Sequence, residues 1–456
     1  MDAPFTFALG VLGCRANQEE IDALRSQLQS RGGRERPFPG PAELVILNSC
    51  AVTTAAQAQS RQALRRALRH KRGGCVAVTG CAAQLAPQEL ASLPGVDLVC
   101  GNREKSRLLD WWEAWRGQSG RAMPRTDSGA GAAIWRGEDP TLERFLTRAS
   151  LLSQPRARAL LKIQDGCSFR CSYCVVSRLR GSVVSRDPAE VVDAVQRLAA
   201  AGFGEVVLTG INLGLYRAPG ATLADLLRRL AALPGRFRIR LSSLEPMTVT
   251  PELIAAVARS PRVCPHLHLA IQSGDDAVLA HMGRPYDRDD LRVLCARIHD
   301  ALPDCGLGAD LIAGFPGEDA AAFERTRALP DELGLTYLHP FAYSERPGTP
   351  GATLPGRLPE RVRKERVAAL RALDARLRAG FAERMRARRL EALIETVDAG
   401  RFRGVAGEYL RLEGPADPAC APRGLRAVTG GSPVAGELHD CHLQAAADAH
   451  LQQGRG

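Results

Sequence analysis

Short runs of apolar residues alternate with amphipathic stretches along most of the chain, a pattern typical of strands that alternate with helices. In the first 115 residues the apolar runs are FTFALGVLG, ELVILNS, CVAVTG and VDLVCG. Between these runs, residues 18–31 and 54–72 show the periodicity of amphipathic helices. The pattern predicts a small parallel α/β sheet in this part of the chain.

A second series of strand-like runs lies in the middle of the chain. Its members are EVVLTGIN, RIRLSSLEP, HLHLAIQSG, LGADLIAGFPGE and YLHPFAYS, and each ends in small or polar residues. Helical segments are predicted between them at residues 188–201, 222–232 and 287–301. Repeated strand–helix units of this kind predict an open or closed parallel barrel, with its site at the carboxyl ends of the strands.

The segments around the barrel complete the predicted domain organisation. Residues 117–142 are rich in Gly, Pro, Ser and Ala without a sustained period, which predicts a linker. Residues 357–389 hold twelve basic and four acidic residues and predict a strongly basic helix, followed by short alternating runs typical of a small β-barrel. The predicted division is an N-terminal α/β domain over 1–116, a linker and entry segment over 117–156, the barrel with its basic exit helix over 157–386 and the small β-barrel over 387–450.

The composition fits a protein of several domains. A chain of 456 residues with 45% hydrophobic content is long enough for two or three domains, each with its own core. No run of eighteen apolar residues occurs, and the first residues, MDAPFTFALG, include an acid and no base. Neither a membrane span nor a signal peptide is therefore predicted, and we expect a cytoplasmic protein.

Charge and cysteine content indicate the kind of partner and the kind of chemistry to expect. The net charge of +11 suits a polyanionic partner such as nucleic acid. The helix predicted at 54–72 has six basic residues and no acid, which indicates either a solvated face or a nucleic-acid contact. Thirteen cysteines, an odd number, in a chain without a secretion signal argue against a disulfide framework and favour metal or redox chemistry.

Three of the cysteines form a local array. Cys167, Cys171 and Cys174 have the spacing C-x3-C-x2-C, and Tyr173 stands between the last two. Three thiolates at this spacing hold three irons of a cubane cluster and leave the fourth iron without a protein ligand. Zinc sites usually have four protein ligands, and no His occurs between residues 151 and 200. An open iron can bind S-adenosylmethionine (SAM) and pass it one electron, so the array indicates a radical SAM enzyme.

Three further cysteines each follow a predicted strand of the N-terminal domain. Cys14 follows LG, Cys50 follows LNS and Cys81 follows VTG. Because the carboxyl ends of parallel strands lie along one edge of a sheet, these thiols could meet and bind a second cluster with one open iron. Buried apolar thiols are the alternative that the spacing alone leaves open.

Together these motifs resemble the radical SAM methylthiotransferase family, and within it the MtaB-type tRNA enzymes that act on N6-threonylcarbamoyladenosine. GCRANQEE, NSCAVT and VTGCAAQ are similar to the cysteine motifs of the family's N-terminal domain, and KIQDGCSFRCSYC is similar to its radical SAM signature. The subfamily rests on VLTGINLG, RLSSLEP, LHLAIQSG, MGRPY and YSERPGTPG. Two departures are VVSRLRG, where the family usually has an isoleucine–proline pair, and Ala270, where Ser is common.

The resemblance implies two [4Fe-4S] clusters and SAM as cofactors, with six catalytic cysteines. One cluster would use Cys14, Cys50 and Cys81, and the SAM-binding cluster would use Cys167, Cys171 and Cys174. SAM cleavage would give a deoxyadenosyl radical that removes the hydrogen from carbon 2 of the adenine, and the N-terminal cluster would deliver the sulfur, methylated by a second SAM. The implied SAM contacts are Tyr173, Thr209, Gly210, Glu245, Gln272 and Ser273.

The implied partners are tRNA, a sulfur donor and an electron donor similar to flavodoxin or ferredoxin, with no membrane. The small β-barrel is similar to the RNA-binding TRAM domain of relatives. Its residues 404–456 hold six acids and four arginines, so phosphate contacts would come from Arg401, Arg403 and the preceding basic helix. Two alternatives stay open: a methylthiotransferase that modifies an aspartate of a ribosomal protein, and a non-enzymatic iron–sulfur RNA-binding redox sensor.

Overall fold

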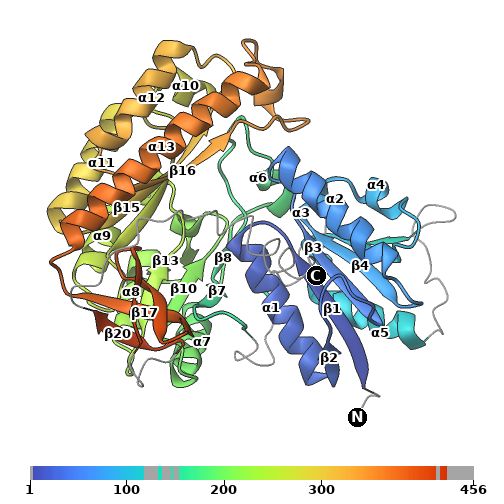
Figure 1. Cartoon of the computed structure of the whole chain (residues 1–456). Helices are drawn as coiled ribbons and strands as arrows, with labels where there is room; N and C mark the ends of the chain where they lie inside the picture. Colours follow the sequence, from blue (N-terminus) through green and yellow to red (C-terminus); the bar gives the residue numbers. More distant parts are fainter. Residues whose placement is uncertain (1–3, 118–131, 136–144, 147–153, 417–421, 429–456) are drawn as a thin grey trace.

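The structure is a computed structural model that describes residues 4–117, 132–135, 145–146, 154–416 and 422–428. Two α/β lobes face each other, and a small antiparallel sheet packs against the second lobe (Figure 1). None of the helices in the described ranges is both long and apolar enough to cross a membrane.

The N-terminal lobe is a six-stranded parallel sheet in the order β2-β1-β3-β4-β5-β6. Its strands are β1 (Phe5–Val11), β2 (Gly33–Glu35), β3 (Leu44–Ser49), β4 (Cys75–Gly80), β5 (Leu98–Cys100) and β6 (Ala133–Trp135). Its helices are α1 (Arg15–Ser30), α2 (Thr54–Arg69), α3 (Cys81–Leu85), α4 (Pro87–Ala91) and α5 (Leu108–Gly117), with the 3-10 turn η1 (Glu104–Arg107).

Helices cover both faces of this sheet, which explains why its central strands are apolar almost throughout. Leu24 of α1 and Trp112 of α5 pack on one face. Leu64 of α2 and Leu90 of α4 pack on the other. Strands β3 and β4 are buried at every position. The predicted parallel α/β domain is therefore confirmed.

The predicted linker at 117–142 contains a strand of this sheet. Strand β6 pairs in parallel with β5, so the sheet extends beyond the domain end predicted at residue 116. The three residues of β6, AIW, follow a run of Gly and Ala, and a strand this short does not stand out from such a composition.

The second lobe is a partial barrel of six parallel strands in chain order. They are β7 (Ala159–Lys162), β10 (Glu205–Thr209), β13 (Arg238–Leu241), β14 (His266–Gln272), β15 (Gly306–Ala313) and β16 (Tyr337–Ala342). Isolated bridges at Ile239–Val263 and Leu244–Leu269 connect β13 with β14. Among the described strands β7 and β16 do not pair with each other, so the barrel is open between them.

The barrel's core helices are α7 (Pro188–Ala200), α8 (Leu223–Ala231), α9 (Pro251–Ala258), α10 (Asp276–His281), α11 (Arg288–Ala301) and α12 (Ala320–Glu332). Shorter elements are α6 (Val176–Arg180), the ladders β8 (Gln164–Asp165) with β9 (Val184–Ser185) and β11 (Arg217–Ala218) with β12 (Ala221–Thr222), and the 3-10 turns η3 (Leu213–Leu215), η4 (Pro246–Thr248) and η5 (Pro350–Thr353).

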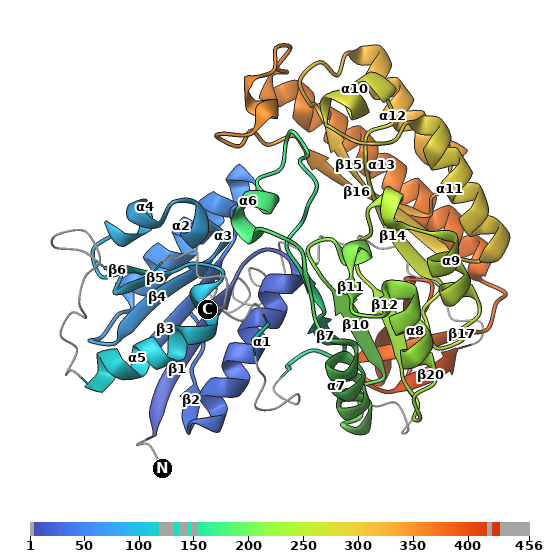
Figure 2. The same cartoon turned by 180° about the vertical axis from the view of Figure 1, so that it is seen from behind.

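The N-terminal lobe contacts both edges of the open barrel. On the β7 side, Lys162 pairs with Glu20 of α1 at 2.8 Å. On the β16 side, the Thr54 N–H at the start of α2 donates to Ser344 Oγ at 2.9 Å. Helix α6 lies between the two lobes in both views (Figures 1 and 2). The gap in the barrel therefore faces the sheet that carries Cys14, Cys50 and Cys81.

The basic helix α13 (Glu360–Met385) packs along β16 through buried apolar residues such as Leu370 and Leu373. It leads to an antiparallel sheet in the order β19-β18-β17-β20. Its strands are β17 (Leu390–Asp398), β18 (Arg401–Ala406), β19 (Arg411–Pro415) and β20 (Leu425–Val428). The predicted small β-barrel is thus present as a four-stranded sheet, and residues 429–450 of that prediction lie outside the described residues.

This sheet covers the amino end of the barrel. The buried Arg238 and Arg240 at the start of β13 pair with Glu205 at the start of β10. Arg240 also donates to the carbonyls of Ala406 (2.9 Å) and Gly407 (2.9 Å). The amino end of the barrel is therefore closed, and its carboxyl end faces the N-terminal lobe.

Candidate functional site

A two-stranded ladder and a glycine hold the loop that carries the local cysteine array. Strands β8 and β9 pair on either side of the loop. Gly166 has φ +75°, and a Cβ there would lie 1.9 Å from the carbonyl oxygen of Ser182, so this position requires glycine. The Cys167 N–H donates to the carbonyl of Gly181 at 3.2 Å, which closes the base of the loop.

Each sulfur of this array accepts a hydrogen bond. The donors are Arg284 Nη1 to Cys171 at 3.0 Å, the Val176 N–H to Cys174 at 3.4 Å and Asn212 Nδ2 to Cys167 at 3.8 Å. Burial raises the pKa of Cys174 to about 12, although the Val176 N–H opposes this shift. A bound iron would have to supply the positive charge that removes these protons. Donors aimed at the sulfurs are what a ligated cluster requires, so these residues fit a [4Fe-4S] cluster.

The second cysteine set lies where three strands of the N-terminal sheet end. Cys14 is the residue before α1, Cys50 follows β3, and Cys81 begins α3 directly after β4. A Cβ on Gly13, which has φ +94°, would lie 2.7 Å from Cys50 Sγ, so the absence of a side chain there lets the backbone approach that sulfur. The three positions expected to meet at the sheet edge do so.

These thiols lie within electrostatic range of one another. Burial, together with the nearby Cys81 and Cys14 thiols, raises the pKa of Cys50 to about 12. Burial also raises the pKa of Cys14, while the positive charge of Arg180 lowers it. Three converging thiols with a cation beside them fit a second three-thiolate cluster.

Arg180 belongs to a buried ionic network between the lobes. It pairs with Glu20 of α1 and donates to Asn17 Oδ1 at 2.6 Å. Glu20 also pairs with Lys105 and Lys162, and Lys162 reaches the Asp165 carboxylate at 3.0 Å. These charged side chains are at most 7% exposed. The network links the cysteine loop of the barrel to the helix that begins beside Cys14.

One cavity of about 380 Å³ joins the two cysteine sets. Cys14 and Cys50 border it from the N-terminal lobe, and Cys174 borders it from the barrel loop. Its other polar and apolar walls come from the carboxyl ends of barrel strands and the segments that follow them: Ile211, Ser243, Gln272, Asp310, Ile312, Phe341, Ala342, Tyr343 and Ser344. A ligand in this cavity would contact residues of both sets.

The predicted SAM contacts fall into two groups. Tyr173 and Gln272 line the cavity, and Gln272 has φ +75° beside a register shift in β14. A left-handed glutamine at a cavity wall is a strained conformation of the kind that marks functional sites. Gly210 lies against Gln164, and a Cβ at position 210 would lie 2.7 Å from the Oε1 atom of Gln164.

The remaining predicted contacts are buried, and the side chains of two of them, Ser273 and Glu245, have protein partners. Thr209 is 1% exposed and ends β10. The hydroxyl of Ser273 lies 3.2 Å from Thr326 Oγ1 and accepts the Asp275 N–H at 3.2 Å. Glu245 forms an ion pair with Arg284. Ser273 is thus engaged in packing the barrel, whereas Glu245 supports the arginine that contacts Cys171.

Sequence reasoning assigned no role to Arg284, Asn212, Asp310 or Arg180. Arg284 and Asn212 lie in MGRPY and TGIN, motifs that carried the family resemblance without a chemical role. Asp310 interrupts the apolar run of β15. A polar residue inside or directly after a buried strand was the available signal, but it does not say which neighbour the residue meets.

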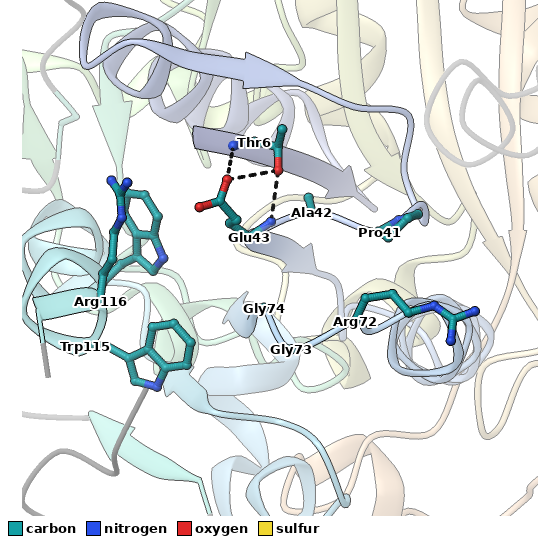
Figure 3. Close-up of a pocket in the computed structure, with 10 residues that line it drawn as sticks. Thr6, Pro41, Ala42, Glu43, Arg72, Gly73, Gly74, Trp115 and Arg116 are labelled. Carbon is teal, nitrogen blue, oxygen red and sulfur yellow. Dashed lines mark hydrogen bonds between the residues drawn. The ribbon is translucent and has the colours of Figure 1, made fainter. Parts of the chain in front are cut away.

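A second hollow, of about 490 Å³, lies at the opposite, amino edge of the N-terminal sheet (Figure 3). Thr6, Glu43, Trp115 and Arg116 are among its lining residues, and no cysteine is. The Glu43 carboxylate accepts the Thr6 N–H at 2.8 Å. This hollow is therefore separate from the cysteine chemistry.

Comparison with known families agrees with this geometry. Residues 161–329 match the Radical SAM superfamily, and residues 6–101 match Uncharacterized protein family UPF0004. The first match covers the loop of Cys167, Cys171 and Cys174. The second covers the sheet with the other three cysteines.

Solved structures support the fold alone. The radical SAM methyltransferase TsrM from Kitasatospora setae is similar with a TM-score of 0.57 and 18% identity, over 76% of this chain and 75% of that one. The cobalamin-dependent SAM radical enzyme OxsB is similar with a TM-score of 0.52 and 11% identity, over 82% of this chain and 56% of that one.

Curated relatives extend over most of the chain. The Threonylcarbamoyladenosine tRNA methylthiotransferase MtaB of Bacillus subtilis is 34% identical over 89% of this chain and 90% of its own length. The enzyme of the same name from Aquifex aeolicus is 36% identical over 85% of this chain and 92% of its own. Identity at this level over nearly the full length of both chains means that the protein belongs to the MtaB family of radical SAM methylthiotransferases.

Proposed function

We propose that the protein adds a methylthio group to carbon 2 of N6-threonylcarbamoyladenosine next to the anticodon of tRNA. The relatives named above carry that substrate in their names. The observation that supports the proposal is the shared cavity, which Cys14 and Cys50 border on one side and Cys174 on the other. Sulfur insertion into a carbon–hydrogen bond needs both chemistries at one substrate atom, and this cavity offers a place where both can act.

The residues fit two resident clusters and SAM. Cys167, Cys171 and Cys174 would hold the SAM-binding cluster, and Cys14, Cys50 and Cys81 would hold the second. When bound, these groups supply the reductive cleavage of SAM and the sulfur that is inserted at carbon 2.

The chain's own part is to orient and to exclude water. Arg284 donates to Cys171 Sγ, pairs with Glu245 and lies 3.3 Å from the hydroxyl of Tyr173, so one guanidinium aligns the cysteine loop and the cavity wall. The N-terminal lobe covers the open side of the barrel, and the C-terminal sheet covers its amino end. Both contacts limit the access of solvent to the barrel interior beside the site.

The partners follow from the chemistry. A one-electron donor similar to flavodoxin or ferredoxin and a sulfur donor must supply what the protein does not make. tRNA is the substrate, and the expected compartment is the cytoplasm, where tRNA is modified.

Nucleoside mass spectrometry of tRNA from cells with and without the gene tests the proposal. The 2-methylthio form of N6-threonylcarbamoyladenosine should be present only in cells that have the gene. Loss of a methylthio group from a ribosomal protein instead would identify the ribosomal-protein enzyme. Deoxyadenosine formation by the reconstituted protein with SAM and a reductant would exclude the redox sensor.

A further inference from the structure

A row of polar side chains crosses the barrel interior below the cavity, and the cysteine chemistry does not use it. It consists of His266 and His268 on β14, Asp310 on β15, and Tyr337 and His339 on β16. The Tyr337 hydroxyl lies 2.9 Å from His266 Nε2 and 2.8 Å from His268 Nδ1. Asp310 Oδ1 lies 2.9 Å from His268 Nε2 and 3.5 Å from His339 Nδ1.

The row is closed at one end. Tyr409, at the edge of the C-terminal sheet, stacks on His266 with ring centroids 4.5 Å apart. His266, His268 and Tyr337 are at most 4% exposed. Asp310 is more open, with its side chain 21% exposed, and it lines the cavity that the cysteines border. The row therefore meets the cavity at Asp310.

Asp310 is a fixed hydrogen-bond acceptor at this position. Burial by itself would raise the pKa of its carboxyl group, but the neighbouring His268 and His339 rings lower it well below the usual range. The carboxylate stays ionised, and the rings hold one of its oxygens in place. An ionised carboxylate can only accept, so it selects a ligand group that donates.

We propose that Asp310 recognises the N6 substituent of the adenine, with His268 and His339 as residues that position Asp310. A threonylcarbamoyl group carries ureido N–H donors. The Asp310 oxygen that the histidine rings do not hold would accept a ureido N–H. An alkyl substituent at N6 would leave that oxygen without a donor, which is how polar sites reject apolar analogues. This inference rests on the proposed function and assigns its specificity.

Binding to anticodon stem-loop RNAs tests this role of Asp310. Fluorescence anisotropy should compare one RNA with N6-threonylcarbamoyladenosine and one with plain adenosine at the same position. Asp310→Asn should reduce the preference for the modified RNA by roughly 10- to 100-fold, the effect expected for losing a hydrogen bond to a charged group. Affinity for the plain RNA should stay within about twofold, because that RNA lacks the substituent.

A matched control comes from α7. Asp193→Asn makes the same change in an exposed ion pair and should not alter the preference. His339→Phe, which removes a ring nitrogen 3.5 Å from Asp310, should reduce the preference less than Asp310→Asn does. Iron content and circular dichroism report whether each variant is folded and loaded.

The outcomes separate this inference from the proposed function. If the parent enzyme methylthiolates the modified RNA but Asp310→Asn keeps its full preference, the role of Asp310 is wrong and the proposed function stands. If the parent forms no methylthio product, the proposed function fails, whatever the variants bind.

The ligand atoms of His268, Asp310 and His339 lie within 4.8 Å of one another. A stoichiometric metal ion that the parent holds and Asp310→Asn loses would overturn the inference in favour of a metal site.

Discussion

The two cysteine sets reach the same cavity by different routes. Cys167, Cys171 and Cys174 lie within eight residues on one loop, which a two-stranded ladder holds at its base. Cys14, Cys50 and Cys81 are separated by 36 and 31 residues, and they meet because three parallel strands end at one edge. The first set needs a loop, whereas the second needs a folded sheet.

The two sets also differ in which lobe supplies the arginine beside them. Arg284 donates directly to Cys171 and belongs to the same lobe as that cysteine. Arg180, the cation near Cys14, comes from the other lobe and is held by Glu20 and Asn17. The dispersed set therefore depends on how the lobes dock, so its cluster should be the more sensitive of the two to changes elsewhere.

The largest expected effect is the loss of the local set. The anaerobically reconstituted protein should hold about eight irons, because it has two separate three-thiolate sets. Replacing Cys167, Cys171 and Cys174 together with Ala should leave about half of the iron and abolish SAM cleavage. Iron analysis and deoxyadenosine assay measure both quantities. A triple variant that keeps all its iron would refute the assignment.

Loss of one ligand from the dispersed set should separate the two reactions. Cys50→Ala should abolish methylthiolation but leave deoxyadenosine formation, because the local set is intact. The packing cost of removing a buried Cys side chain is about 1 to 2 kcal/mol, so the fold should survive. Circular dichroism checks this. Methylthiolation at the parent rate by folded Cys50→Ala protein would mean that these cysteines are structural.

The dependence on lobe docking has its own test. Arg180→Met leaves Glu20 and Asp165 without one of their buried partners, which should cost about 3 to 5 kcal/mol of unfolding free energy. Removing the exposed Arg197 from its pair with Asp193 should cost at most about 1 kcal/mol. Thermal unfolding measures both.

Iron content tests whether docking of the lobes matters more for the dispersed set than for the local set. In the background that lacks Cys167, Cys171 and Cys174, Arg180→Met should lower the remaining iron. In a background that lacks Cys14, Cys50 and Cys81, the same change should lower it less. Equal losses in the two backgrounds would show that docking of the lobes does not favour the dispersed set.

The smallest expected effect concerns the basic helix of each lobe. Many arginines of α13 are paired, as Arg366 is with Glu318 and Arg376 with Asp331. Helix α2 begins at the cavity rim and exposes Arg65, Arg66 and Arg69. We expect Gln at those three positions to flatten the salt dependence of tRNA binding by roughly 0.7 to 0.9 log unit per lost phosphate contact.

The matched variant replaces the exposed Arg371 and Arg384 of α13, and the exposed Arg389 shortly after it, with Gln. The salt dependence of tRNA binding should change less in this variant than in the α2 variant, because α2 lies nearer the cavity. A larger change in salt dependence for the α13 variant would mean that the main phosphate contact is made by the basic exit helix, as the sequence predicts.

Much of the fold could be read from the sequence because its signals are local. Apolar runs such as LVILNS and CVAVTG are strands buried on both faces, and that burial leaves a continuous pattern. Strand β6 was missed because three apolar residues after a Gly/Ala run carry too little pattern. The local cysteine array was recognisable for the same reason as the long strands, since its spacing lies within one loop.

By itself the sequence determined the alternation of strands and helices, the six cysteines and the chemistry that three thiolates per set can support. Only the tertiary structure decided that both sets border one cavity, that Arg180 reaches Cys14 from the other lobe, and that Asp310 meets that cavity between two histidines. The physical reason is distance along the chain. Spacing within a loop fixes which side chains can share a ligand, whereas contacts between strands of different lobes depend on register, burial and docking that no short motif encodes.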